Sequence, residues 1–420
     1  MKITLMTIGT HGDVRPYVAL GKGLKAAGFE ICVATHEEFR GFVTDNGLQF
    51  HPVKGNPRDM LASDTGQQLM ASGKSVTKFF AEFRNAAEKD MYEGFSDCYE
   101  AAKGAEAIIF PFFVAGVGYQ IARKLDCKTI LGYLQPTLPT NAFPVIMLPH
   151  LYLGGFLNKA SHKIGEGIFW HFFHDTLARW SQEILSLDSP SRWRPPFKAL
   201  AKESLVLMGF SKYLVPTPLD WKKKVHLTGF WSLPTGQHYT PPATLERFLE
   251  QSPTPIYIGF GSMAEKEAQQ LQEDIATVLE HTGQRAVLVS GWSALNSQGI
   301  SENLYCLESI PHDWLFPRVR MAIHHGGAGT TSTAARAGIP QIIVPFFGDQ
   351  PFWGQRIFGM GAGPRPIPRT ALNADKLEHA VRQVLEHPRY TEHAATLGKR
   401  LQQEDGVTNA VQQIQAFLRA

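Results

Sequence analysis

The sequence has few cysteines and almost no excess of charge of either sign. Four cysteines occur in 420 residues, and no two of them have the spacing of a metal site or a redox motif. We therefore expect reduced thiols in a cytoplasmic protein. The formal net charge of +3 is too small to indicate nucleic acid as a partner.

Long apolar runs are also lacking. No uninterrupted run reaches the length of a transmembrane helix, and the first residues, MKITLMTIGTHGDV, lack the cleavage site of a signal peptide. We expect any contact with a membrane to be peripheral. The stretch Trp193–Lys198 mixes aromatic and basic side chains, which suits such a contact and equally suits an ordinary surface turn.

What the sequence has is the pattern of two α/β domains. Helical spacing of apolar residues over Pro16–Ala27 separates two apolar runs that predict strands, and a proline-rich connector at about 215–255 precedes a second α/β pattern. The predicted strands are Ile3–Ile8, Glu30–Ala34, Ala107–Phe110, Thr129–Gly132, Pro255–Phe260, Ala286–Ser290, Arg320–His324 and Gln341–Val344. We expect two Rossmann-like domains facing each other across a ligand-binding cleft, namely 1–217 and 218–395, with a C-terminal helix at 396–420 returning to the first.

A glycine-rich turn, HHGGAGTT, runs from His324 to Thr331 between a predicted strand and a predicted helix. Glycines let a ligand approach the backbone, and a helix start presents free N–H groups and a positive dipole end, which together bind phosphate. His325, Thr330 and Thr331 can add side-chain hydrogen bonds. Such a turn also occurs where a helix merely packs on a strand. We expect His324 to orient the loop.

A second polar segment, VPFFGDQPFWG, runs from Val344 to Gly354 just after the next predicted strand. The carboxylate of Asp349 accepts hydrogen bonds and the amide of Gln350 both donates and accepts, which suits sugar hydroxyls. Capping of a helix start by Asp349 is the other interpretation, and both roles are compatible.

These two segments together resemble the donor-binding signature of the inverting, GT-B-fold glycosyltransferases. The DQPFWG run is similar to that of sterol glucosyltransferases. Further resemblance lies in three loops, Gly9–Pro16, Phe260–Met263 and Ile310–Phe316, and in Phe169–Trp180, which is similar to the sterol-type acceptor region. The resemblance implies a UDP-glucose donor or a related nucleotide sugar, a lipophilic acceptor, and no cofactor.

The resemblance also assigns donor contacts. It implies that the donor phosphates contact His325, Thr330, Ser262 and the backbone of Gly327 and Gly329, that Pro311 helps to hold the base, and that Asp349 and Gln350 bind sugar hydroxyls. Two positions depart from the family pattern. Thr333 stands where many relatives have a ribose-binding Glu, and Ser309 stands where a Trp often begins the base-reading segment. The choice between a uridine and a thymidine donor therefore stays open.

Transfer needs a base that takes the proton of the acceptor hydroxyl. Asp13 stands where relatives carry a His or Asp base, so the resemblance implies that Asp13 is catalytic. A helix cap is the alternative role, because Asp13 lies at a predicted helix start. His11 is the second candidate base. The aromatic stretch around 135–200 predicts an apolar acceptor site, with Phe143, Phe169, Trp170 and Phe173 as its contacts.

No Asp-x-Asp motif, which holds the metal in metal-dependent glycosyltransferases, occurs in the chain. We expect no metal site, with the leaving diphosphate stabilised by the helix start, His325 and hydroxyls. His171, His174 and Asp175 have helical metal-ligand spacing, but their aromatic neighbours favour a place beside the acceptor site. His36 is expected to be structural or to face the cleft.

Three functions remain open. The first is glucosyl transfer to a sterol or a similar polycyclic alcohol. The second is the same chemistry with another acceptor, such as a macrolide, carotenoid or phenolic compound, or with a TDP-sugar donor. The third is a nucleotide-sugar-binding accessory protein without catalysis. A Rossmann dehydrogenase is disfavoured because Gly9–Gly12 lacks the complete dinucleotide fingerprint.

Overall fold

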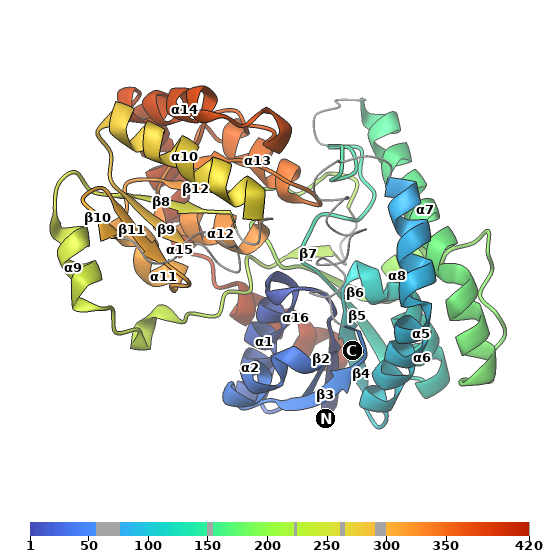
Figure 1. Ribbon diagram of the computed structural model, residues 1–420. Helices are drawn as coiled ribbons and strands as arrows, with labels where there is room; N and C mark the ends of the chain where they lie inside the picture. The colour runs from blue at the N-terminus through green and yellow to red at the C-terminus, as the bar shows by residue number, and fades with distance from the viewer. Residues whose placement is uncertain (56–75, 149–153, 222–224, 261–264, 290–299, 420) are drawn as a thin grey trace. The chain divides into compact units, whose positions relative to one another are not determined.

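The computed structural model of the chain describes residues 1–55, 76–148, 154–221, 225–260, 265–289 and 300–419 (Figure 1). The chain forms two compact units. Unit 1 comprises Met1–Lys212, Pro216–Leu233 and Glu404–Ala420, and unit 2 comprises Tyr213–Val215 and Pro234–Gln403. The predicted divisions at residues 217 and 395 are therefore displaced: residues 218–233 belong to unit 1, and residues 396–403 belong to unit 2.

Unit 1 contains a seven-stranded parallel sheet in the order β3-β2-β1-β4-β5-β6-β7. Because the strands are parallel, their carboxyl ends share one edge of the sheet, where the loops after β1, β4 and β5 become neighbours. The strands are β1 (Lys2–Met6), β2 (Glu30–His36), β3 (Gln49–Val53), β4 (Ala107–Phe110), β5 (Lys128–Tyr133), β6 (Leu205–Met208) and β7 (Val225–Leu227).

Helices cover both faces of this sheet (Figure 1). Ile3 and Leu5 of β1 point into a core formed with α1 and α16. On the opposite face, the hydroxyl of Thr4 donates to the carbonyl of Ala101 in α5 at 3.0 Å. The helices are α1 (His11–Ala26), α2 (Arg40–Asp45), α5 (Val76–Ala102), α6 (Ala115–Leu125), α7 (Gly155–Glu183), α8 (Phe197–Glu203) and α16 (Gly406–Arg419), with short 3-10 turns η1 (Glu37–Phe39) and η2 (Phe112–Val114).

The C-terminal helix α16 is an integral part of unit 1. Ala410 and Ile414 are fully buried in the core that α1 forms on the sheet. A side chain at Gly23 of α1 would collide with Val407, so this glycine permits close packing of the two helices. The amide of Asn409 donates to the carbonyl of Thr228 at 2.9 Å, which ties α16 to the segment after β7.

Unit 2 contains a six-stranded sheet in the order β10-β11-β9-β8-β12-β13, in which only the β10–β11 pair is antiparallel among the described residues. The strands are β8 (Ile256–Gly259), β9 (Ala286–Val289), β10 (Ile300–Ser301), β11 (Leu304–Leu307), β12 (Ala322–His324) and β13 (Gln341–Ile343). The helices are α9 (Ala243–Glu250), α10 (Glu265–Thr282), α11 (His312–Leu315), α12 (Ala328–Ala337), α13 (Gln350–Gly359), α14 (Ala374–Glu386) and α15 (Arg389–Gln402), with 3-10 turns η3 (Gly236–His238), η4 (Phe316–Arg318) and η5 (Arg369–Ala371).

The two faces of this second sheet are both apolar, as expected for a parallel sheet covered by helices. Ile256 and Ile258 pack with α10 and α14 on one face, whereas the intervening Tyr257 packs with α9, α11 and α12 on the other. The alternation follows from the two-residue period of a strand. The predicted α/β class with two Rossmann-like units is confirmed.

Candidate functional site

The loop between β12 and α12 turns on a glycine in the left-handed region. Gly326 has φ +89°, and a Cβ atom there would lie 2.7 Å from Ile343 and 3.1 Å from the backbone oxygen of Gln350. Neither the conformation nor the space admits a side chain. The buried His324 holds the turn, because its Nδ1 accepts from the N–H of Gly326 at 3.0 Å while its Nε2 donates to Oε1 of Gln341 at 2.9 Å. The prediction that His324 orients this loop is confirmed.

The amino terminus of α12 has the properties of an anion site. Gly327 is the N-cap residue and no side chain caps the helix, while a Cβ at Gly329 would meet no atom within 4 Å. Nδ1 of His325 and Oγ1 of Thr331 are buried and lack a hydrogen-bond partner in the part of the chain that the structure describes. Buried polar atoms are normally satisfied, so these atoms and the free helix N–H groups fit a bound phosphate.

Burial keeps both histidines of this loop neutral. It lowers the pKa of His324 to about 3, with a further contribution from the neighbouring His325, and it lowers the pKa of His325 to about 4. At neutral pH His325 is therefore a hydrogen-bond donor or acceptor toward a ligand and not a resident cation. The fixed positive potential of the site comes from the dipole of α12.

These two pKa values predict acid destabilisation of the protein. Between about pH 6.5 and pH 4 each of these histidines is protonated in the unfolded chain but not in the folded chain. The free energy of unfolding therefore falls as the pH falls, by roughly 1.4 kcal/mol per pH unit for each histidine. Unfolding midpoints measured from pH 7.5 to pH 4 should drop less steeply for His324→Gln, which does not titrate. The exposed His379→Ala should follow the wild type, and an unchanged slope in His324→Gln would contradict the assignment.

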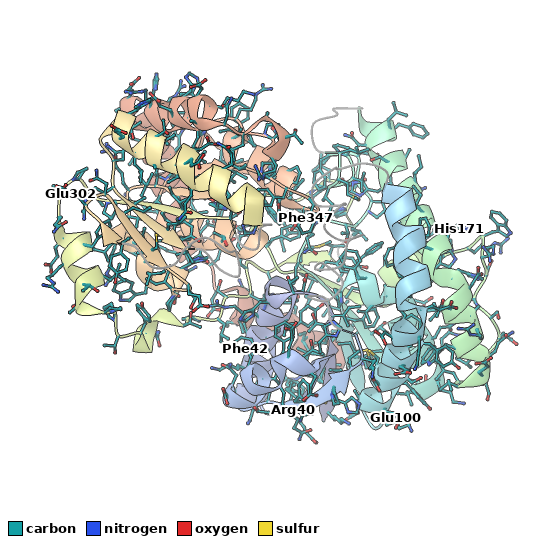
Figure 2. All side chains as sticks on the ribbon, viewed as in Figure 1. Arg40, Phe42, Glu100, His171, Glu302 and Phe347 are labelled. Carbon is teal, nitrogen blue, oxygen red and sulfur yellow. The ribbon has the colours of Figure 1, made fainter. Side chains whose placement is uncertain are left out.

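Gln350 and Asp349 lie next to the glycine loop. The buried Gln350 accepts at Oε1 from the N–H groups of Phe346 at 2.8 Å and Phe347 at 3.2 Å, so these two bonds do not use its amide nitrogen. Oδ2 of Asp349 accepts from the indole N–H of Trp353 at 2.7 Å, and its side chain makes no cap hydrogen bond to α13. Phe347, labelled in Figure 2, is exposed. The contact of Asp349 and Gln350 with sugar hydroxyls stays a prediction.

The predicted base-reading segment is the start of α11. Pro311 is its N-cap residue and is half-buried. Asp313 accepts at Oδ2 from the N–H groups of Thr235 at 2.9 Å and Gly236 at 2.8 Å, which fastens the chain before η3 to this segment. The phenol of Tyr257 lies 2.9 Å from Nε2 of His312. The segment is thus held by hydrogen bonds within unit 2, and its role toward a base stays a prediction.

The loop after β1 places Asp13 in the first turn of α1. Oδ2 of Asp13 accepts from the N–H of Thr10 at 2.9 Å and from its hydroxyl at 3.2 Å, in a capping-box arrangement. Gly9 has φ +127°, and a side chain there would collide with the same carboxylate oxygen. The capping role is therefore observed, and it leaves open whether the half-buried carboxylate also serves as a base.

His11 lies on the solvent side of the same turn. Its ring contacts Phe42, labelled in Figure 2, edge to face at a centroid distance of 4.8 Å, and Phe39 at 5.8 Å. These aromatic contacts belong to η1 and α2. They direct the imidazole toward that side of unit 1, and participation of His11 in proton transfer stays a prediction.

Two of the predicted acceptor residues, Phe169 and Phe173 of α7, lie in an aromatic cluster. Their ring centroids are 4.5 Å apart, and Phe169 lies 5.1 Å from Phe112 and 5.7 Å from Phe113. Phe112 follows β4 and stacks on Phe197 of α8 at 5.0 Å. This cluster therefore borders the carboxyl edge of the first sheet, where the Asp13 loop also begins.

The other two predicted acceptor residues take different positions. Trp170 is buried, and its indole N–H donates to the carbonyl of Ser191 at 3.1 Å, so it packs α7 against the following loop. Phe143 is half-buried and meets Trp221 edge to face at 6.4 Å. Contact of these two residues with an acceptor stays a prediction.

Sequence reasoning did not find Glu166, which lies one helical turn before Phe169 on α7. Burial raises the pKa of this carboxyl to about 7. Tyr133, at the end of β5, is a neighbour: burial raises its pKa far above the usual value, and the charge of Glu166 adds to the effect. No local pattern distinguishes this glutamate, because its burial depends on α7 lying over the end of β5.

His174 of α7 is fixed by contacts with its neighbour in the helix and with the loop that follows. His174 is held by the carbonyl of Pro190 at 2.9 Å and by Asp175 at 3.0 Å, and Arg192 donates to the same carboxylate. Within residues 1–55, 76–148, 154–221, 225–260, 265–289 and 300–419, no group of three or more His, Cys, Asp or Glu side chains is arranged to hold a metal ion. Thr333 donates to the carbonyl of Gly329 at 2.8 Å. Ser262 lies outside the described residues.

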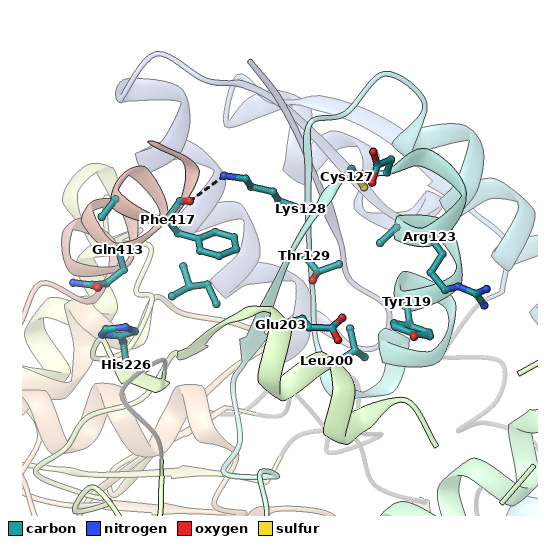
Figure 3. Close-up of a pocket in the computed structure, with 14 residues that line it drawn as sticks. Tyr119, Arg123, Cys127, Lys128, Thr129, Leu200, Glu203, His226, Gln413 and Phe417 are labelled. Atoms are coloured by element: carbon teal, nitrogen blue, oxygen red, sulfur yellow. Dashed lines mark hydrogen bonds between the residues drawn. The ribbon is translucent and has the colours of Figure 1, made fainter. Parts of the chain in front are cut away.

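A cavity of about 800 Å³ in unit 1 lies elsewhere (Figure 3). It is lined by the first residues of β5 and β6, by the end of α6, and by α16, whose Phe417 carbonyl accepts from Nζ of Lys128 at 3.2 Å. Because parallel strands begin at the opposite edge from where they end, this cavity lies away from the loops that carry Asp13 and Phe112. It is not the predicted acceptor site.

Comparison with known proteins shows which class of protein the chain resembles. The N-terminal domain of glycosyltransferase family 28 matches residues 3–101, and the C-terminal domain of the erythromycin biosynthesis protein CIII-like family matches residues 290–417. The calicheamicin glycosyltransferase CalG4 has a TM-score of 0.70 at 16% identity over 100% of this chain and 98% of its own. The spinosyn rhamnosyltransferase SpnG, in complex with thymidine diphosphate, has a TM-score of 0.65 at 16% identity over 99% of this chain and 100% of its own. The chain therefore resembles the GT-B-fold nucleotide-sugar glycosyltransferases, in sequence at both ends and in fold throughout.

Over nearly its whole length the chain is similar to sterol 3-beta-glucosyltransferases. The protein of Arabidopsis thaliana is 34% identical over 98% of this chain and 64% of its own length. The protein of Komagataella phaffii is 33% identical over 98% of this chain and 34% of its own length. The chain thus spans less than two thirds of these relatives.

Proposed function

We propose that the chain transfers glucose from UDP-glucose to the hydroxyl of a sterol or a similar lipophilic polycyclic acceptor, with inversion at the sugar carbon. The observation that carries the donor part is the amino terminus of α12, where Nδ1 of His325 and Oγ1 of Thr331 are buried without a partner among the described residues. Similarity to the sterol 3-beta-glucosyltransferases supports the acceptor class.

The donor would be held by three segments of unit 2. The N–H groups around Gly327 and Gly329 and the hydroxyl of Thr330 take the diphosphate, with Ser262 as a further predicted contact. Asp349 and Gln350 take the sugar hydroxyls, and the start of α11 at Pro311 takes the base. The proximity of Gly326 to the backbone of Gln350 supports simultaneous contact with diphosphate and sugar.

In the proposed reaction Asp13 acts as the general base, with His11 as the alternative. The carboxylate takes the proton of the acceptor hydroxyl as that oxygen forms a bond to the anomeric carbon. The bond from that carbon to the diphosphate oxygen breaks, and its electron pair leaves with the diphosphate. The N–H groups of α12 and the side chain of His325 stabilise the added negative charge. The proposal includes no metal ion and no cofactor.

Two functions are alternatives to glucosyl transfer onto a sterol. A macrolide, carotenoid or phenolic acceptor, or a TDP-sugar donor, would use the same chemistry, and a relative of the same fold is known in complex with thymidine diphosphate. A non-catalytic accessory protein would bind the nucleotide sugar without turnover. The aromatic cluster around Phe169 supports a large apolar acceptor but does not select among these classes.

We also propose that the protein acts in the cytoplasm and contacts membranes peripherally through Trp193–Lys198. No helix in the described part of the chain combines the length and apolarity needed to span a bilayer. Trp193 is 87% exposed, and Arg194 and Lys198 are close to it in the chain. An exposed indole beside cations suits the interfacial region of an anionic bilayer.

A donor-by-acceptor activity panel tests the proposed function. UDP-glucose and a TDP-sugar are each combined with sterols, macrolides and phenolic compounds, with and without a metal chelator. We expect sterol-dependent consumption of UDP-glucose that is unchanged by the chelator. Turnover with macrolides or phenolic compounds alone would select the second function, nucleotide-sugar binding without turnover would select the accessory role, and loss of activity in chelator would refute the metal-free mechanism.

A further inference from the structure

His36 is a buried histidine at the carboxyl end of β2, and both of its ring nitrogens face backbone groups. Nδ1 lies 3.2 Å from the carbonyl oxygen of Val53 at the end of β3. Nε2 lies 3.2 Å from the backbone nitrogen of Gly9. A carbonyl only accepts and a backbone N–H only donates, so Nδ1 carries the hydrogen and Nε2 accepts. The ring is therefore a neutral imidazole in one defined tautomer.

Burial favours the same protonation state. It lowers the pKa of His36, against smaller opposing effects from the hydrogen bond to Val53 and from the charge of Glu38. A protonated ring would direct a second N–H at the N–H of Gly9, and the contact would be lost. The neutral ring is thus the form that can hold the loop.

Gly9, which donates its N–H to His36, also lies directly against the carboxylate of Asp13. Gly9 adopts φ +127°, which brings its Cα so close to Oδ2 of Asp13 that a side chain could not be accommodated. The next residue, Thr10, donates its N–H and its hydroxyl to that oxygen. The contacts therefore run in series from His36 through Gly9 and Thr10 to Asp13.

We propose that His36 is a positioning residue, which fixes the turn Gly9–Thr10 and thereby the carboxylate of Asp13 for proton transfer. The proposal rests on the proposed function, because it assumes that Asp13 is the base. His324 of unit 2 has the same arrangement, since its Nδ1 accepts from the N–H of Gly326. In unit 1, His36 at the end of β2 holds Gly9 in the loop after β1. In unit 2, His324 at the end of β12 holds Gly326 in the loop that follows the same strand.

The test compares His36→Ala with His36→Gln, whose amide offers an acceptor oxygen and a donor nitrogen. We expect His36→Ala to lower kcat by about 10- to 100-fold with little change in KM for UDP-glucose, since misplacement of a catalytic group lowers the rate of the chemical step. His36→Gln should recover most of kcat. His51→Ala, on neighbouring β3, is the matched control and should keep the wild-type kcat.

A double-mutant cycle with Asp13→Asn separates positioning from a general structural role. If His36 acts through Asp13, His36→Ala should cause no further loss of kcat in the Asp13→Asn background. Losses that multiply would overturn the proposal, as would a wild-type kcat in His36→Ala. If Asp13→Asn itself keeps the wild-type kcat, the proposed base is wrong and the failure belongs to the proposed function.

Protein folding is monitored separately for each variant. The thermal unfolding midpoint and the affinity for UDP report whether a variant is folded. Should His36→Ala not fold, His36→Leu takes its place, because leucine fills the buried space without offering an acceptor to Gly9. The same pattern of outcomes then applies to His36→Leu.

Discussion

Asp13→Asn should lower kcat by about 100- to 10,000-fold, the range that a positioned general base contributes, while KM for UDP-glucose stays close to the wild-type value. Asparagine cannot take the acceptor proton, but its side-chain oxygen can still accept from the N–H and hydroxyl of Thr10. The cap of α1 is therefore preserved, and the loss reports on chemistry. Steady-state kinetics with a sterol acceptor and UDP-glucose measures it.

The matched control for Asp13→Asn is the same substitution at another helix start of unit 1. Asp405 precedes α16 and accepts from the N–H of Thr408 at 3.0 Å and from its hydroxyl at 2.7 Å. Asp405→Asn should keep the wild-type kcat. A second variant, Asp13→Ala, should show the same loss of kcat and also lower the stability by about 1 kcal/mol, because the cap is removed. If kcat of Asp13→Asn stays within a few-fold of the wild-type value, Asp13 is a helix cap and not the catalytic base.

His325→Ala is expected to lower kcat/KM for UDP-glucose by about 100- to 1,000-fold, the typical effect of removing one preorganised donor from a developing oxyanion. The ring nitrogen Nδ1 is buried without a partner in the described part of the chain, so it is available to a phosphate oxygen. Its neutral state means that the substitution removes a hydrogen bond and leaves the net charge at neutral pH unchanged. Titration of UDP into the variant should show a weaker affinity than in the wild type.

The pH dependence of the affinity for UDP also tests whether His325 contacts the diphosphate. A bound diphosphate favours the protonated imidazole, so its presence should raise the pKa of His325 from about 4. The wild-type affinity for UDP should therefore increase as the pH falls from 7 toward 5, relative to His325→Ala measured at the same pH values. The exposed His379→Ala is the control and should behave as the wild type. Equal affinities in His325→Ala and the wild type would place the diphosphate elsewhere.

Most strands of both sheets could be predicted from apolar runs of four to six residues bounded by glycine, proline or charge. The strands β3, β6, β7, β10 and β11 were not predicted, and the first two of them have a clear physical reason. β3 contains Pro52 and half-exposed residues, which a strand tolerates only at the edge of a sheet. β6, LVLM, is a continuous apolar run that emerges from an irregular aromatic stretch, and length alone cannot assign so short a run to a strand.

The division into units depended on contacts that no local pattern reveals. The density of proline indicated a break near residue 217, but Pro216–Leu233 still belongs to unit 1, and the long segment of unit 2 begins only at Pro234. Trp231 is the reason, since its ring packs edge to face on Tyr17 at 5.7 Å and its indole N–H donates to the hydroxyl of Thr228 at 3.0 Å. Proline restricts the local backbone conformation, whereas the boundary of a unit depends on which side chains pack into its core.

The sequence by itself indicated the resemblance to GT-B glycosyltransferases, the two α/β units, the glycine turn at Gly326 and the separate polar segments that carry Asp13, His325 and Gln350, because these depend on local conformation and short-range spacing. Only the tertiary structure decided the protonation states and tautomers. His36 is a neutral acceptor because the end of β3 supplies the carbonyl of Val53, and burial lowers the pKa of His324 and His325. These properties arise from desolvation and from partners distant in the chain, and no short segment carries that information.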